Sequence, residues 1–295
     1  MRFTITSTSL FTVATCALLS SARPTQNKRA LFGSDTANGM SDVLFGDEDC
    51  KDVAVIFARG TFDSGNIGVW VGPQFQAALQ SQINSLAFEG VDSTAYPATL
   101  QTYLGEGGSD GGAQSLASTV TDYVNFCPDS SVVISGWSQG ALVAHKGLSL
   151  LTPEVQAKVV GLVTFGDPNK LFTNEPVPSN VAFKTECIGG TTLDPLCSDI
   201  PADFKFPTSL DDITGPFSQL PHFATGVAET AAAASLVLRF PGQLLASRSA
   251  FLDALTDKTK MQRLLLTPEH FTYGNNGLTS DAADFVAALP AVVGK

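Results

Sequence analysis

The sequence has little charge, and most of the charge it has is acidic. Of its 295 residues only 15% are Asp, Glu, Lys or Arg, and 17 basic residues stand against 28 acidic ones, which gives a formal net charge of −11. Proteins that bind nucleic acid or an anionic membrane surface present a basic patch. The composition therefore argues against both partners and favours a neutral or apolar one.

Long hydrophobic runs are also lacking. The apolar stretch near the N-terminus, residues 10–19, is too short to span a bilayer, and no later run approaches the length of a spanning helix. Because this stretch follows Arg2 and precedes small residues, it predicts a secretory signal peptide over residues 1–22. The dibasic pair Lys28-Arg29 predicts the end of a propeptide that covers residues 23–29. We therefore expect a secreted, extracellular protein without a transmembrane segment, in which residues 30–295 form a single domain.

Cysteines are few. There are five, and one of them, Cys16, falls in the expected signal peptide. Secretion places the other four in an oxidising environment, where they should pair, and four cysteines allow three connectivities. We choose Cys50 with Cys127, which would tie the start of the fold to the segment before a central strand, and Cys187 with Cys197, which encloses a short loop. A thiol nucleophile and a zinc site are correspondingly disfavoured, and we expect no metal and no cofactor.

The body of the chain alternates β-branched runs with helix-like stretches and contains no internal repeat, a pattern typical of an α/β fold with a mainly parallel sheet. Its 44% hydrophobic content suffices for the core of one large domain. The predicted strands are residues 53–58, 91–96, 131–135, 159–165 and 181–185. The predicted helices are residues 72–86, a stretch that ends near residue 125, and residues 141–150 and 281–289. The glycine-rich residues 105–112 do not fit a dinucleotide-binding motif, so we interpret them as a flexible loop.

Residues 198–267 differ from the rest of the body. They show no strand-like alternation and are rich in alanine and leucine, so we expect a helical insertion. Its apolar residues would either form a lid or acyl-binding wall over a catalytic site or pack as an extra helical layer, since an apolar helix face by itself indicates only burial. These residues are Leu236, Val237, Leu238, Phe240, Leu244, Leu245, Phe251 and Leu252.

The run Gly136-Trp137-Ser138-Gln139-Gly140 matches G-x-S-x-G, the pattern of a nucleophile elbow. An apolar strand precedes it and a helix follows, so Ser138 should lie on a tight turn in which side chains at Gly136 and Gly140 would collide with their surroundings. The backbone N–H of Gln139 would then point toward a reacting carbonyl, where the helix dipole favours an oxyanion. The alternative is an ordinary surface turn of an α/β protein.

A serine nucleophile needs a base, and the chain has only three histidines. His145 falls two helical turns beyond Ser138, so we interpret it as structural. His222 lies inside the insertion. We choose His270, because it lies in a loop before the last predicted helix and after the candidate acids, the order that α/β-hydrolases follow.

The acid that orients the histidine has two main candidates. Asp194 follows a predicted strand and lies in the loop that the second cysteine pair would close, which would hold it in place. Asp167 ends the preceding strand and is the competitor. Asp199 and Asp203 follow just beyond the loop, and any of the four could instead be a solvated loop carboxylate.

Several motifs taken together resemble a known family, the fungal cutinases and the related acetylxylan esterases. The resemblance covers roughly residues 50–197 and 268–290. The motifs are Phe57-Ala58-Arg59-Gly60-Thr61 with Gly65-Asn66-Ile67-Gly68, Cys127-Pro128-Asp129, the elbow, an aspartate three residues before Cys197, and His270-Phe271-Thr272-Tyr273-Gly274. The resemblance implies a small α/β-hydrolase with a mainly parallel sheet of about five strands flanked by helices, here with a helical insertion before the histidine.

Carried over to this chain, the resemblance implies Ser138 as nucleophile, Asp194 as acid and His270 as base. It also implies an oxyanion hole formed by the backbone N–H groups of Thr61 and Gln139, with the threonine hydroxyl as a further donor. The same two disulfides are implied.

Two features depart from the family. The connection between the second cysteine pair and the histidine is short in most members, whereas residues 198–267 intervene here. Trp137 stands where tyrosine is usual, and we expect this change to affect packing only.

The expected function is hydrolysis of carboxylic esters through an acyl-enzyme, with cutin, polyester or lipid-like acyl esters as substrates. One alternative is an acetylxylan-type esterase that removes small acyl groups from a polysaccharide. An alternative of another class is a secreted surface-binding or effector protein that keeps the fold without turnover. We expect a monomer that acts on an apolar or polymeric ester and has no nucleic-acid partner.

Overall fold

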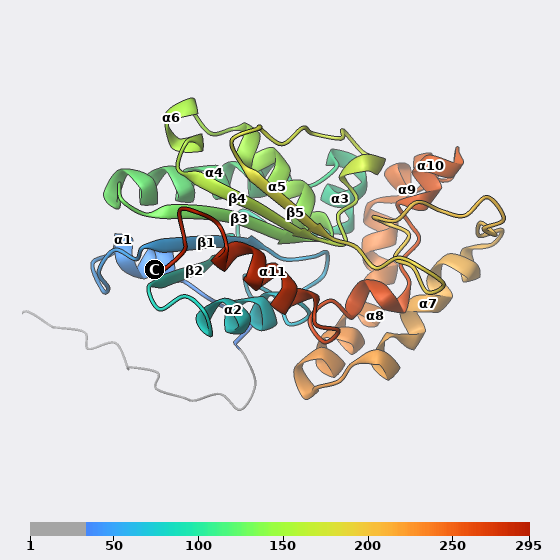
Figure 1. The fold of residues 1–295 in the computed structure, drawn as a ribbon. Coiled ribbons are helices and arrows are strands. Elements are labelled where there is room, and N and C mark those ends of the chain that lie inside the picture. The colour runs from blue at the N-terminus through green and yellow to red at the C-terminus, as the bar shows by residue number, and fades with distance from the viewer. Residues whose placement is uncertain (1–33) are drawn as a thin grey trace, which may run out of the picture. The chain divides into compact units, whose positions relative to one another are not determined.

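A five-stranded parallel sheet in the order β2-β1-β3-β4-β5 forms the centre of the fold (Figure 1). The computed structural model describes residues 34–295, apart from the side chains of Leu210, Phe217, Ser218 and Phe223. The strands are β1 (Val53–Ala58), β2 (Leu86–Gly90), β3 (Ser131–Trp137), β4 (Val159–Phe165) and β5 (Ala182–Glu186). The predicted α/β fold with a parallel sheet of about five strands is therefore confirmed.

The expected signal peptide, the expected propeptide and Cys16 lie outside the described residues. The described residues belong to one compact unit. Within residues 34–295, no helix has both the length and the apolar character needed to cross a membrane.

Both faces of the sheet are buried at its central strands, because alternate strand residues belong to two different hydrophobic clusters. The odd-numbered residues of β1 share one cluster with α2 (Gly72–Gln80) and α11 (Leu278–Ala287). The even-numbered residues share the other with α1 (Gly39–Leu44), α4 (Asp110–Phe126) and α5 (Gln139–Ser149). Figure 1 shows α4 and α5 on the opposite side of the sheet from α2 and α11. Strands buried on both faces have continuous apolar sequences, which is why the predicted bounds of β1 and β4 are confirmed.

The strand β2 lies before the position that the sequence predicts. The prediction of a strand over residues 91–96 is wrong, because a turn occupies this segment. The carboxylate of Asp92 accepts hydrogen bonds from the N–H groups of Thr94 and Ala95 at 3.0 and 2.8 Å, which bends the chain away from the sheet. The local bonding of one aspartate therefore outweighs the strand propensity of its neighbours.

The glycine-rich residues 105–112 form a boundary between two helices rather than a flexible loop. The first helix is α3 (Leu100–Glu106), and α4 begins directly after Ser109. The hydroxyl of Ser109 accepts a hydrogen bond from the N–H of Gly112 at 3.0 Å and caps α4. The interpretation as a flexible loop was therefore wrong.

The insertion is helical, as predicted, and covers the end of the sheet where the strands have their carboxyl termini (Figure 1). It consists of α7 (Leu210–Phe223), α8 (Val227–Ala246), α9 (Arg248–Ala254) and α10 (Lys258–Gln262). These helices contact α3 and two 3₁₀ turns, η1 (Asn169–Leu171) after β4 and η2 (Pro268–Phe271) before α11. The short α6 (Pro153–Gln156) leads from α5 to β4. In open parallel sheets this end carries the ligand-binding site.

Both chosen disulfides are present. Cys50 is bonded to Cys127 across 77 residues and ties the segment before β1 to the end of α4. Cys187 is bonded to Cys197, 10 positions further along the chain, and closes a short loop directly after β5. The predicted connectivity is therefore confirmed.

Candidate active site

Ser138 lies on a sharp turn between the end of β3 and the start of α5. Its φ of 60° and ψ of −123° fall in a region that residues other than glycine rarely adopt. The turn is so tight that a Cβ at Gly140 would collide with the carbonyl oxygen of Ala58. Glycine is therefore required there, and the turn holds the serine hydroxyl at the carboxyl edge of the sheet.

The side chain of Gln139 is fixed by hydrogen bonds at both ends of its amide. Its Nε2 donates to Oγ1 of Thr61 and to the carbonyl oxygen of Thr99, each at 2.9 Å. Its Oε1 accepts from the hydroxyl of Thr102 at 2.8 Å. This network joins the first residue of α5 to the loop after β1, so the two residues expected to form the oxyanion hole are held side by side.

His270 and Asp194 form a buried pair. His270 Nδ1 lies 2.7 Å from Oδ2 of Asp194, and the two side chains are 1% and 0% exposed. An ionised carboxylate only accepts hydrogen bonds, so Nδ1 donates, and Nε2 is left as the acceptor. This Nε2 has no hydrogen-bond partner among the described residues, and His270 lines the same pocket as Ser138.

Several groups keep Asp194 ionised despite its burial. The hydroxyl of Tyr273 donates to Oδ2 at 2.7 Å, and the N–H of Leu196 donates to Oδ1 at 3.0 Å. Burial alone would raise the pKa of Asp194, but the electrostatic effect of the adjacent His270 and the hydrogen bonds to the carboxylate outweigh burial and lower the pKa overall. Gly166, with φ of 53°, lies against the pair, where a side chain would collide with both members.

The other candidate acids and bases lie elsewhere. Asp167 is buried too, but its Oδ2 is 2.8 Å from Nε2 of His145, so these two residues form a pair of their own. His222 is exposed near the end of α7 and does not line the pocket. Asp199 and Asp203 are exposed. Of the predicted alternatives, the structure thus brings only Asp194 to His270.

Two residues contact the histidine–aspartate pair in ways that the sequence analysis missed. One is Tyr273, which bonds to Asp194. The other is Trp137, whose ring stacks on His270 with centroids 5.3 Å apart and whose Nε1 donates to the His270 carbonyl at 3.1 Å. The expectation that Trp137 affects packing only was therefore wrong. Its position next to the elbow serine was the available signal.

The loop after β1, residues Thr61 to Asp63, is held from both sides. Phe62 has φ of 67°, an unfavourable value for a bulky residue. Its carbonyl oxygen accepts a hydrogen bond at 2.6 Å from Nη2 of Arg239, which belongs to α8 of the insertion. On the other side, Nε of Arg59 donates to the carbonyl of Asp63 at 3.1 Å. Burial raises the pKa of Asp63 to about 7, although the N–H groups that bond to it act in the opposite direction.

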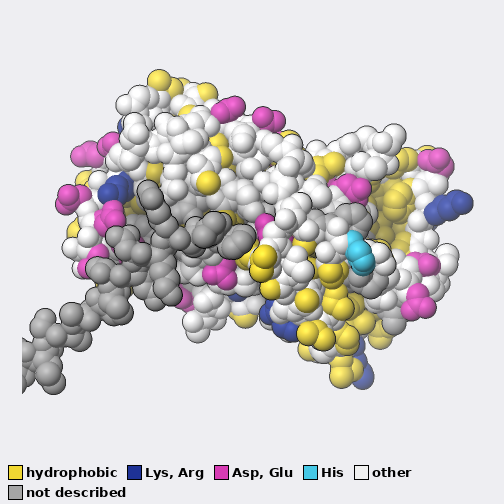
Figure 2. All heavy atoms as spheres, turned by 90° about the horizontal axis from the view of Figure 1, so that it is seen from below, with side chains coloured by type: hydrophobic (Ala, Val, Ile, Leu, Met, Phe, Trp, Pro, Cys, Tyr) yellow, Lys and Arg dark blue, Asp and Glu magenta, His cyan; other side chains and the backbone are white. Residues whose placement is uncertain are grey.

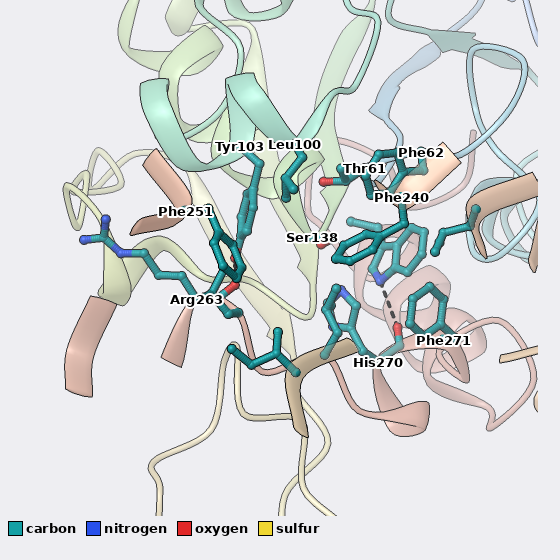
Figure 3. Close-up of a pocket in the computed structure, with 15 residues that line it drawn as sticks. Thr61, Phe62, Leu100, Tyr103, Ser138, Phe240, Phe251, Arg263, His270 and Phe271 are labelled. Atoms are coloured by element: carbon teal, nitrogen blue, oxygen red, sulfur yellow. Dashed lines mark hydrogen bonds between the residues drawn. The ribbon is translucent and has the colours of Figure 1, made fainter. Parts of the chain in front are cut away.

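An apolar pocket lies over Ser138 and His270, and the insertion supplies much of its wall (Figure 3). The insertion residues in the wall include Ile213, Leu236, Phe240, Phe251, Leu264 and Leu266. Figure 3 shows Phe240 and Phe251 pointing into the pocket from opposite sides. The cavity volume is ≈ 30 Å³, room for a few water molecules, whereas pockets that bind organic ligands measure ~300–1,000 Å³. The insertion therefore closes the site in this conformation.

The described residues contain no group of three or more His, Cys, Asp or Glu side chains arranged to hold a metal ion. The groups assembled at the pocket are instead those of covalent serine chemistry. A hydroxyl, an imidazole with a free acceptor nitrogen and a buried carboxylate lie together under an apolar cover.

The parallel sheet, the serine on a strand-to-helix turn and the buried histidine–aspartate pair define the class of the α/β-hydrolases. A family model described as Cutinase matches residues 49–208, more than half of the chain. The chain belongs to the cutinase family and is a carboxylic ester hydrolase. The matched segment ends before α7, so the helices that close the pocket, and His270, lie beyond it.

Two relatives that are named cutinases agree with the family model. The chain is 43% identical over 141 residues to a cutinase of Botryotinia fuckeliana, and the aligned region covers 47% of this chain and 66% of the relative. It is 42% identical over 176 residues to cutinase 4 of Emericella nidulans, and the aligned region covers 59% of this chain and 70% of the relative. A solved structure of Trichoderma reesei cutinase with a phosphonate inhibitor is 32% identical and covers 69% of this chain and 79% of that one, with a TM-score of 0.46.

Proposed function

We propose that this protein hydrolyses esters with long or polymeric apolar acyl groups, with cutin-like polyesters as the substrate class, through an acyl-enzyme on Ser138. The observation that carries the proposal is the placement of Ser138 and of the His270–Asp194 pair at one apolar pocket. The names of the relatives, which are cutinases, support the substrate class.

In the proposed mechanism, Oγ of Ser138 attacks the ester carbonyl while Nε2 of His270 takes its proton and then delivers it to the leaving alcohol. Asp194 holds the imidazole with Nδ1 protonated and stabilises the imidazolium that forms. Water then attacks the acyl-enzyme with His270 as base, which releases the acid and restores the serine. The hydrogen bond between Asp194 and His270 is already present in the closed site, whereas the one from Ser138 to Nε2 of His270 would form when the pocket opens to the substrate.

The negative oxygen that develops in each step would be held by the N–H groups of Thr61 and Gln139. Gln139 lies in the first turn of α5, where N–H groups have no acceptor within the helix and the dipole favours negative charge. The hydroxyl oxygen of Thr61 already accepts a hydrogen bond from Gln139, so its proton is directed elsewhere. The Thr61 hydroxyl therefore supplies a third hydrogen-bond donor to the oxyanion.

Arg239 is expected to act as a positioning residue for this oxyanion hole. Because its hydrogen bond holds the strained Phe62 next to Thr61, Arg239→Ala should lower kcat about tenfold with little change in KM. Arg239→Lys should recover part of the loss. The measurement is the steady-state rate on a soluble p-nitrophenyl ester.

Arg248, exposed at the start of α9, provides the control for Arg239. Arg248→Ala removes an arginine from the same insertion without touching the loop and should leave kcat unchanged. Equal kcat values for Arg239→Ala and the wild type would show that α8 does not position the loop.

The apolar wall that the insertion supplies is an argument for a substrate with a long acyl group. Phe240 contacts Phe62 edge-on with ring centroids 6.3 Å apart, so Phe240 borders both the pocket and the loop after β1 that contains Thr61. The opening that a substrate needs must come from movement of the insertion, since the closed cavity is too small. We therefore assign the insertion as a lid whose inner side contacts the acyl chain once the substrate is bound.

The acyl-chain preference tests this assignment. The wild type should keep its activity on p-nitrophenyl esters from acetyl to palmitoyl, whereas a loss beyond propionyl would favour an acetylxylan-type esterase. Phe240→Ala should lower kcat/KM on the long esters about tenfold relative to the acetyl ester, because only a long chain reaches the ring. Leu245→Ala is the matched control on the same helix, 71% exposed, and should leave the preference unchanged.

We further propose that the protein is secreted, with residues 1–22 as signal peptide and residues 23–29 as propeptide, and acts as a monomer. The two disulfides support secretion, because such bonds persist in oxidising compartments. The excess of acidic residues supports the proposed absence of a nucleic-acid partner.

A further inference from the structure

Helix α8 is apolar on the side that faces solvent as well as on the side that faces the pocket. Its inner side buries Leu236 and Phe240. On its outer side, Val227, Leu238 and Leu245 are 69%, 81% and 71% exposed. A helix at a protein surface carries polar residues on its outer side, whereas one that is apolar all round is covered by something. The outer side of α8 therefore has the composition of a contact surface.

Five of the exposed apolar residues of α8 lie along one line. We call them the outer stripe: Val227, Ala231, Ala234, Leu238 and Leu245. They follow one another at intervals of three, four and seven residues, which places them on the same face of a helix. Figure 2 shows hydrophobic side chains gathered over the insertion, to which α8 belongs.

Charge decides what kind of surface fits the outer stripe. Along its twenty residues α8 carries only Glu229 and Arg239 as charged residues, and Arg239 donates a hydrogen bond to the carbonyl oxygen of Phe62. The chain as a whole has a formal charge of −11, so an anionic bilayer would repel it. The stripe therefore fits an apolar and uncharged surface.

The outer stripe is continuous with the candidate active site, because the two sides of one helix form them. A helix is about 10 Å across, so a surface that rests on the stripe lies within that distance of the cavity wall at Leu236 and Phe240. A soluble ester enters the pocket without needing such a surface. An insoluble one must first be held next to the pocket.

We propose that the outer stripe adsorbs the protein to a solid, uncharged aliphatic polyester. The choice of this partner rests on the proposed function, but adsorption itself requires no turnover. Contact would bury the exposed leucines and hold α8, the helix that must move for the pocket to open, at the polymer surface.

Adsorption to a polycaprolactone film tests the proposal. Ser138→Ala serves as the background so that the film stays intact during the measurement. Adding Leu238→Ser and Leu245→Ser should weaken adsorption about tenfold for each leucine, because each loses the burial of an apolar side chain. Leu150→Ser is the matched control, since Leu150 is 54% exposed but lies at the end of α5, outside the insertion. It should leave adsorption unchanged.

In the active background, the Leu238→Ser, Leu245→Ser protein should hydrolyse soluble p-nitrophenyl butyrate at the wild-type rate, which shows that it is folded. Undiminished adsorption of this double variant would overturn the proposal, as would an equal loss with Leu150→Ser. A dimer in light scattering that the double substitution dissociates would also overturn it, because the stripe would then be a subunit interface. Tighter binding to anionic vesicles than to the film would overturn the choice of partner.

These results are separable from the proposed function. A wild-type protein that adsorbs through the outer stripe but hydrolyses no ester would refute the esterase activity and leave the docking surface intact. A protein that hydrolyses soluble esters but adsorbs independently of the stripe would refute the docking surface alone.

Discussion

Ser138→Ala is expected to lower kcat for ester hydrolysis by at least ~10⁴-fold and to abolish covalent labelling by an organophosphate. The hydroxyl oxygen of Ser138 is the atom that would form the acyl bond and, with an organophosphate, the phosphoryl bond. Alanine removes this atom but leaves the strand, the turn and the apolar pocket in place. The measurements are the rate on p-nitrophenyl butyrate and the mass of the labelled protein.

Ser135 is the matched control for this experiment. It lies three residues earlier on β3, is fully buried, and is therefore shielded from a reagent in the pocket. Ser135→Ala should still take up one label. A wild-type protein that takes up no label would refute the serine mechanism and favour the non-catalytic surface-binding or effector protein. Labelling that persists in Ser138→Ala would place the nucleophile elsewhere.

The parts that the sequence predicts correctly depend on short-range patterns. β1 and β4 are continuous apolar runs because they are buried on both faces, and their short length and β-branched residues distinguish them from a buried helix. The elbow around Ser138 is recognisable because a tight strand-to-helix turn tolerates only glycine at its closest approach. Cys187 and Cys197 are close in the chain, so their pairing needed no knowledge of the fold.

The parts that the sequence does not predict depend on contacts between distant residues. Arg239 and Phe62 are 177 positions apart, and nothing near either residue indicates that they meet. Both sides of α8 carry apolar residues, so periodicity cannot tell Phe240, which faces the pocket, from Leu238, which faces solvent. The residues alone also left Asp194 and Asp167 as competitors, because each follows a strand. The geometry separates them by their different histidine partners.

Asp194→Asn is expected to lower kcat by ~10⁴-fold with little change in KM, the magnitude seen for the equivalent change in serine proteases. The carboxylate accepts the proton of His270 Nδ1, which leaves Nε2 without a proton and able to take one from Ser138. The side-chain amide of asparagine instead has an oxygen on one side and an N–H donor on the other. The N–H of Leu196 donates to Oδ1 and keeps the amide oxygen there, so the amide nitrogen takes the place of Oδ2. Its N–H then faces Nδ1 of His270 and moves the imidazole proton to Nε2. The histidine then cannot act as base.

Asp167→Asn is the control that the fold itself provides. Asp167 is a buried carboxylate 2.8 Å from a histidine, just as Asp194 is 2.7 Å from His270, but its partner His145 does not line the pocket. The same substitution therefore perturbs a buried pair equally in both variants and should lower the stability of each, measured as the midpoint of thermal unfolding. Only Asp194→Asn should also lower kcat. Comparable losses of kcat in the two variants would mean that the effect comes from stability, and a loss confined to Asp167→Asn would reverse the assignment of the acid.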